Sequence, residues 1–162
     1  MTNHLKLADS YLRLSDEEKK YGNESESITN QREIIRDYCK KQGIIIVSEF
    51  VDDGYSGGNF ERPGFQAMLN HLAAGKANTV ITKDLSRLGR DMTESSYYAE
   101  RFFPEHGIHY LAPGNDFDSM GDNLMAPFQF AMNDVYLRDT SRKVKQTLDM
   151  KRKKGKYAAC PP

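Results

Sequence analysis

Apolar positions in the first quarter of the chain follow a strand pattern and then a helix pattern. Residues 5–14 alternate loosely between apolar and polar and predict a strand, whereas residues 16–26 are polar and predict a loop. Ser27 is a suitable N-cap for a helix that ends near Gly43. The apolar face of this helix carries Ile28, Ile35 and Cys39. The pattern therefore indicates a strand, a loop and a helix in succession.

A second strand and a second helix follow. The β-branched run at 43–51 predicts a strand that is buried on both faces. The glycine-rich run at 52–61 is too polar for a core and predicts a mobile loop. Pro63 suits the first turn of a helix that ends before Gly75. The helical period is kept by Phe65, Met68, Leu69 and Leu72.

Two more strand patterns complete the first 126 residues. Residues 78–82 and 108–112 predict short strands, and Thr93 suits the start of a helix between them that runs to about Glu105. The inward positions of this helix are Tyr98 and Phe102. Strands that alternate with helices predict an α/β fold with a largely parallel central sheet.

The last part of the chain differs from the rest. Residues 127–156 predict one long helix, which begins at Pro127 and whose apolar face fades into charge. We expect it to leave the body of the domain and pack on a partner subunit. Residues 157–162 end in a Pro pair and predict the start of a linker. The expected division is a core over 1–126, the long helix over 127–156 and the linker.

Composition and charge narrow the class of protein. The chain has 162 residues, no run approaching the ~20 apolar residues that span a membrane, and no leader, so we expect one cytoplasmic domain. Its net charge is zero, yet residues 138–156 hold nine basic residues against two acidic ones. A basic arm on an acidic body is typical of a protein with a polyanion partner. The candidate DNA-binding residues are Arg138, Arg142, Lys143, Lys145, Lys151, Arg152, Lys153 and Lys154.

The two cysteines are too far apart in the sequence to resemble a metal site. Cys39 and Cys160 predict a buried thiol and an exposed tail thiol rather than a disulfide. The four histidines (His4, His71, His106 and His109) are scattered, and we expect them to be surface or packing residues.

Candidate chemistry gathers where predicted strands and loops end. Arg13 and Ser15 share one face at the carboxyl end of the first strand, which is where ligands bind in open α/β sheets. Arg87 and Arg90 are three residues apart, and at a helix start this spacing directs both guanidiniums to one side. Arg62 ends the glycine-rich loop.

These residue types suit attack on a phosphodiester. A serine hydroxyl needs to lose its proton to become a good nucleophile, and several arginines can neutralise the phosphate oxygens and the charge of the transition state. No motif with metal-ligand spacing lies nearby, so we expect arginines in place of a metal and no cofactor.

Five motifs, in this order and spacing, resemble the catalytic domain of the serine recombinases (the resolvase and invertase family). They are YLRLS, SITNQ, DDGYSGGNFERPGF, TKDLSRLGRD and YLRDTSRK. The wording is most similar to that of the large serine recombinases of conjugative transposons. The resemblance implies that residues 1–126 are a three-layer, flavodoxin-like catalytic core and that the long helix serves dimer, tetramer and DNA contacts. It also implies that the linker at 157–162 leads to DNA-binding domains absent from this chain. It also implies staggered cleavage of double-stranded DNA, a phosphoserine bond to the 5′ ends, subunit rotation and religation without metal or ATP.

The resemblance also implies roles for single residues. Ser15 is the nucleophile, and the scissile phosphate is held by Arg13, Arg62, Arg87 and Arg90. The polar positions that would support the site are Gln31, Asp53 and Ser56.

The sequence departs from the family pattern in two places. Ser86 stands where many members have an aspartate directly before the arginine, and Asp84 lies two residues earlier, so the role of any acid stays open. Asp9 and Ser10 occupy usually apolar positions of the first strand. Ser10 lacks the Arg-x-Ser context and is not a candidate nucleophile.

Two other interpretations remain open from the sequence. A small α/β phosphatase or nucleotide-binding domain would leave the basic helix unexplained, and the chain lacks a CxxxxxR loop, a Walker sequence and GxGxxG. A DNA-binding or oligomerisation module without chemistry would not need Ser15 and its arginines.

Overall fold

The structure is a computed structural model, and it describes residues 5–14, 27–55, 60–89, 91–121, 142–143, 145–147 and 149–150. Its strands are β1 (Leu7–Leu14), β2 (Ile45–Asp53), β3 (Thr79–Ile81), β4 (His109–Ala112) and β5 (Phe117–Asp118). They form one sheet in the order β2-β1-β3-β4-β5. All neighbours run parallel except β4 and β5, which are antiparallel. This confirms the expected α/β class.

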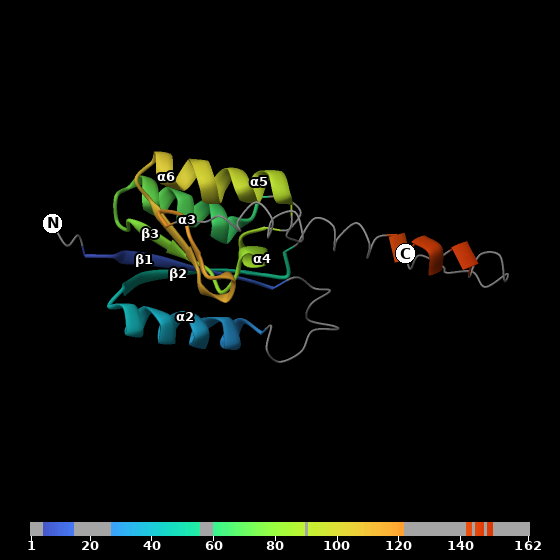
Figure 1. The fold of residues 1–162 in the computed structure, drawn as a ribbon, viewed down its shortest axis with the longest axis horizontal. Helices are drawn as coiled ribbons and strands as arrows, with labels where there is room; N and C mark the ends of the chain where they lie inside the picture. The colour runs from blue at the N-terminus through green and yellow to red at the C-terminus, as the bar shows by residue number, and fades with distance from the viewer. Residues whose placement is uncertain are drawn as a thin grey trace.

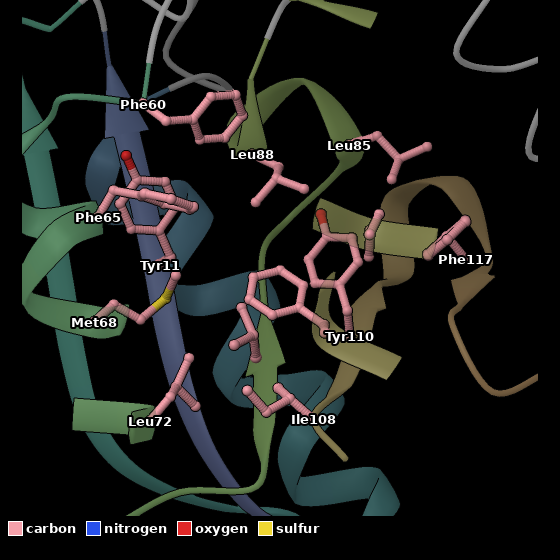
Figure 2. Packing of buried hydrophobic residues seen from close by; sticks show 14 of the residues in the cluster. Tyr11, Phe60, Phe65, Met68, Leu72, Leu85, Leu88, Ile108, Tyr110 and Phe117 are labelled. Atoms are coloured by element: carbon pink, nitrogen blue, oxygen red, sulfur yellow. The ribbon is translucent and has the colours of Figure 1, made fainter. Parts of the chain in front are cut away.

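Helices cover both faces of the sheet, so the domain has three layers, with the sheet in the middle (Figure 1). Helix α2 (Ile28–Gln42) covers one face, where its apolar side chains pack on β1, β3 and β4. The opposite face is covered by α3 (Pro63–Ala73), α4 (Leu85–Leu88), α5 (Met92–Ser96), the π-helix η2 (Tyr97–Phe102) and α6 (Phe103–Glu105). A short 3-10 turn, η3 (Pro113–Asn115), leads into β5. Figure 2 shows the larger core, in which Tyr11 of β1 lies beside Phe65 and Met68 of α3, and Tyr110 of β4 lies beside Phe117.

Local signals placed two helices where the sequence predicts them. The Ser27 hydroxyl accepts a hydrogen bond from the Asn30 amide at 3.1 Å and caps α2. The helix stops at Gly43, whose φ of 66° lies in the left-handed region that favours glycine. Pro63 occupies the first turn of α3, where its missing N–H is no loss.

The prediction that the strand at 43–51 is buried on both faces is wrong. β2 is the edge strand next to β1, and Asp52 is its one buried residue. Ile45, Val47 and Val51 are 47, 42 and 38% exposed. An apolar run typical of a central strand can also form an edge strand, because the run does not determine the order of strands in the sheet.

Two predicted boundaries also change. The glycine-rich loop begins after β2 rather than at residue 52, and Phe60 within the predicted loop is buried in the core. The helical run at 92–105 is capped by Asp91 rather than Thr93, because the Asp91 carboxylate accepts from the Glu94 amide at 2.9 Å. Its end at Glu105 agrees with the prediction.

The polar pair in β1 lies in the interior. Asp9 and Ser10 are 0% and 1% exposed. Asp9 Oδ2 is 2.8 Å from His71 Nδ1, and burial raises the pKa of this carboxyl despite the opposing contact with His71. His71 and His109 are therefore partners of carboxylates, since His109 also contacts Asp118.

Other predictions can be placed only in part. Of the predicted helix at 127–156, the described residues 142–143, 145–147 and 149–150 are helical and exposed, and the rest lies outside the described residues. Cys39 is buried, as expected, and burial raises the pKa of its thiol to about 11. Cys160 and His4 lie outside the described residues. Within the described part of the chain, no helix is long and apolar enough to cross a membrane.

Candidate active site

The carboxyl ends of β1 and β3 form the centre of the candidate site. β2 and β3 lie on opposite sides of β1, so the strand order reverses between β1 and β3. In open α/β sheets this switch point leaves a crevice outside the carboxyl ends of the strands. Arg13 is the penultimate residue of β1, and the segment after β3 leads into α4.

The side chains of Arg13 and Arg87 link the end of β1 to the segment around Ser86, although 74 positions separate the two arginines. The Arg13 guanidinium donates from Nη2 to the Ser86 carbonyl at 3.0 Å and from Nη1 to the Tyr55 carbonyl at 3.2 Å. The Arg87 guanidinium donates from Nη1 to the Arg13 carbonyl at 3.0 Å. Both residues are buried, at 0% and 5% exposure. The two arginines therefore fix the end of β1 against the segment that contains Ser86.

Gln31 reinforces the same strand end from the other face of the sheet. Its side-chain amide accepts from the Arg13 amide at 3.3 Å and donates to the Arg13 carbonyl at 2.9 Å. The side chain belongs to α2 and is fully buried. The amide thus pairs with both polar main-chain groups of Arg13, as a neighbouring strand would.

Arg62 is buried at 1% exposure among aromatic rings. Its guanidinium carbon lies 5.5, 4.7 and 5.3 Å from the ring centres of Tyr11, Phe60 and Phe65. Nη2 donates to the Leu88 carbonyl at 2.6 Å. Burial lowers the pKa of Arg62, although the nearby Tyr11 and Asp52 act in the opposite direction.

Asp84, Ser86 and Arg87 form a chain of polar contacts. The Ser86 hydroxyl donates to Asp84 Oδ1 at 2.5 Å and accepts from Arg87 Nε at 3.3 Å. Arg87 Nε lies 3.7 Å from the same Asp84 oxygen. The carboxylate therefore reaches the arginine both directly and through the serine hydroxyl.

One expectation about the arginine motif is wrong. The sequence places Arg87 and Arg90 at a helix start, but α4 ends at Leu88 and Arg87 lies in its last turn. Gly89 is extended, with φ of −177°, so the helical geometry that would align the two guanidiniums does not continue past it. Arg90 lies outside the described residues.

The remaining predicted residues divide into two groups. Asp53 is exposed at the end of β2, and Arg142, Lys143 and Lys145 are exposed helical residues. The predicted site residues outside the described part of the chain are Ser15, Ser56, Arg138, Lys151, Arg152, Lys153 and Lys154.

Sequence reasoning missed Asp52 and Tyr11. Asp52 is 1% exposed and accepts a hydrogen bond from the Tyr11 hydroxyl at 2.8 Å. Burial raises the pKa of the Tyr11 phenol, so the hydroxyl keeps its proton and acts as the donor. Strand alternation placed Asp52 on the same face as the partly buried Phe50, and an acidic residue on that face was the available signal.

Fold and site together define a flavodoxin-like α/β domain with buried arginines gathered at the carboxyl edge of its sheet. The sequence model of the family "Resolvase, N terminal domain" matches residues 8–157. The chain therefore belongs to this family.

The proteins similar to this chain include one of similar sequence and two solved structures of similar fold. An "uncharacterized immunity region protein 3" of Bacillus phage phi105 is 35% identical over 65 residues, which are 40% of this chain and 77% of that protein. The N-terminal catalytic domain of TP901-1 integrase has the same fold, with a TM-score of 0.64 and 22% identity over 86% of this chain and 98% of that one. A resolvase-family site-specific recombinase from Streptococcus pneumoniae gives a TM-score of 0.60 and 19% identity over 91% and 99%.

Proposed function

We propose that this chain is the catalytic domain of a site-specific DNA recombinase that excises or integrates a mobile element. In this proposal the Ser15 hydroxyl attacks the scissile phosphodiester, and a bond from Oγ to phosphorus replaces the bond to the leaving 3′ oxygen. The DNA then carries a 5′-phosphoserine link, and religation reverses the step after strand exchange. The phage origin of one relative agrees with a mobile element.

The observation that carries this proposal is a pair of contacts: the Arg13 guanidinium donates to the Ser86 carbonyl, and the Arg87 guanidinium donates to the Arg13 carbonyl. Ser15 follows Arg13 by two residues, so these contacts hold the strand end that directly precedes the proposed nucleophile. Both guanidiniums are held at the switch point, where an anionic ligand would bind. Buried arginines at such a point suit the phosphate oxygens, because their donors match them in geometry and charge.

Burial of the Arg62 guanidinium is energetically unfavourable, and this supports a role in phosphate binding. Among the described residues, its Nε and Nη1 have no hydrogen-bond partner although both atoms are buried. Each unmet buried donor costs about 1–3 kcal/mol, and more when it belongs to a charged group. A buried arginine with one hydrogen bond to the described part of the chain is poorly suited to a purely structural role. We propose that Arg62 and Arg90 bind the scissile phosphate together with Arg13 and Arg87.

Asp84 and Ser86 take a supporting role in this proposal. Ser86 stands where an aspartate is common in the family, and its hydroxyl links the Asp84 carboxylate to Arg87. We propose that Asp84 orients Arg87 through this hydroxyl. Gln31, Asp53 and Ser56 complete the proposed support.

The proposed partner is double-stranded DNA, bound by a homodimer that assembles into a tetramer on paired sites. The basic residues between 138 and 154, of which Arg142, Lys143 and Lys145 are exposed in the structure, would bind phosphates without reading sequence. Such binding weakens steeply as salt concentration rises, because each neutralised phosphate releases counterions.

Capture of the covalent intermediate tests the proposal. The full-length recombinase is incubated with DNA that carries its paired sites and quenched with detergent, and protein–DNA adducts are separated by electrophoresis. We expect Ser15→Ala to abolish the adduct and Ser10→Ala, which alters a buried serine of β1 five residues earlier, to retain it. A normal adduct yield from Ser15→Ala would refute the assigned nucleophile. Absence of adducts from the unmodified protein would favour a non-catalytic DNA-binding module or a phosphatase-like enzyme.

A further inference from the structure

Asp52 ties the edge strand β2 to the first turn of α3. Its carboxylate accepts from the Gly64 amide at 2.8 Å through Oδ1 and from the Phe65 amide at 2.9 Å through Oδ2. Within the described part of the chain, Arg62, the N-cap residue of α3, makes no side-chain capping bond. Asp52 therefore supplies the cap from another element, and its negative charge also suits the helix N-terminus.

The fit between Asp52 and the helix is tight. A Cβ atom at Gly64 would lie 2.9 Å from three atoms of the Asp52 carboxyl group, closer than van der Waals contact allows. The absence of a side chain at this position lets the carboxylate reach both amides. Asp52 and the first turn of α3 are consequently held in one arrangement.

The same carboxylate controls two of the three rings around Arg62. It accepts from the Tyr11 hydroxyl at 2.8 Å and from the main chain of Phe65. These two rings contact each other edge to face, with centres 5.5 Å apart, beside Phe60 (Figure 2). A cation over aromatic faces is attracted by the rings, so their placement determines where the Arg62 guanidinium lies.

Asp52 also compensates the buried positive charge of Arg62. It does so from nearby, without a hydrogen bond that would occupy the N–H donors of the guanidinium. Nη2 of Arg62 donates to the Leu88 carbonyl, whereas Nε and Nη1 have no partner among the described residues. A direct ion pair would engage these donors. Three rings and a nearby carboxylate instead hold the guanidinium and leave two donors for a ligand.

We propose that Asp52 is a positioning residue for strand cleavage, because it places the Arg62 guanidinium through the Tyr11 ring and the first turn of α3. This inference rests on the proposed function, in which Arg62 binds the scissile phosphate. Asp52 itself touches neither the phosphate nor Ser15 in this scheme. Its effect on the rate passes through Arg62.

The test compares rates of adduct formation in the full-length recombinase on paired-site DNA. Tyr11→Phe removes one hydroxyl and keeps the ring, and Asp52→Asn removes the charge. Asp9→Asn is the matched control, since Asp9 is also a buried carboxylate but binds His71 rather than the Arg62 rings. Urea unfolding of each variant establishes the folded fraction, to which the rate is normalised.

We expect Asp52→Asn to slow adduct formation by roughly tenfold and Tyr11→Phe by about threefold or more, as befits lost hydrogen bonds to a charged group. Asp9→Asn should lose stability and keep its rate within about twofold, because its contacts do not reach Arg62. The inference is overturned if Tyr11→Phe reacts within twofold of the unmodified protein, or if Asp9→Asn is slowed as much as Asp52→Asn. Tyr11→Phe is the deciding variant if Asp52→Asn does not fold. Adducts from Ser15→Ala would instead overturn the proposed function itself.

Discussion

Replacement of Gln31 by alanine removes the link between α2 and the end of β1. The Gln31 amide makes two hydrogen bonds to the main chain of Arg13, at 3.3 and 2.9 Å, and both residues are fully buried. Alanine takes away the acceptor of the Arg13 amide. The Arg13 carbonyl still accepts from Arg87. The damage is therefore concentrated on one buried N–H group two residues before Ser15.

The size of the effect follows from these contacts. Each lost hydrogen bond contributes about 1 kcal/mol, and a buried donor deprived of its acceptor costs about 1–3 kcal/mol. Because these terms overlap and the site relaxes in part, we expect Gln31→Ala to lower the free energy of unfolding by about 3 kcal/mol. For a domain of this size each kcal/mol shifts Tm by about 2–4 °C, so Tm should fall by roughly 6–12 °C.

Urea and thermal unfolding followed by circular dichroism measure this loss. Gln42→Ala is the matched control, because Gln42 is an exposed residue at the end of the same helix and should change stability by less than about 0.5 kcal/mol. A loss below about 1 kcal/mol for Gln31→Ala would show that the amide does not hold the strand end. Equal losses in both variants would show a general effect of helix truncation instead.

Two further predictions concern the acidic pair and the buried thiol. Asp84→Asn should slow adduct formation roughly tenfold. A second change, Ser86→Asp, should restore most of the rate, because it places a carboxylate beside Arg87. No recovery in the double variant would contradict the proposed role of Asp84. In a Cys160→Ser background, iodoacetamide at pH 8 should label Cys39 far more slowly in the folded protein than in urea, because a pKa of about 11 leaves roughly one thiol in a thousand ionised. Equal labelling rates with and without urea would show that Cys39 is accessible.

The sequence alone predicted the features that depend on neighbouring residues. The helix from Ser27 to Gly43 and the start of α3 at Pro63 follow from capping and from the conformations that proline and glycine favour. The alternation of strands and helices, which predicted the α/β class, also follows from a local signal, the periodicity of apolar positions. Five sequence motifs, read together, also identified the family, which the match over residues 8–157 confirms.

Only the tertiary structure decided which distant residues become partners. It placed β2 at the sheet edge, brought Arg13 against Arg87 across 74 positions, and buried Arg62 among three rings with Asp52 behind them. An arginine at the end of a polar loop reads as a surface residue, because local sequence carries no information on the aromatic side chains that fold over it. Local propensities act within a few residues, whereas strand order and side-chain packing depend on contacts between segments far apart in the chain.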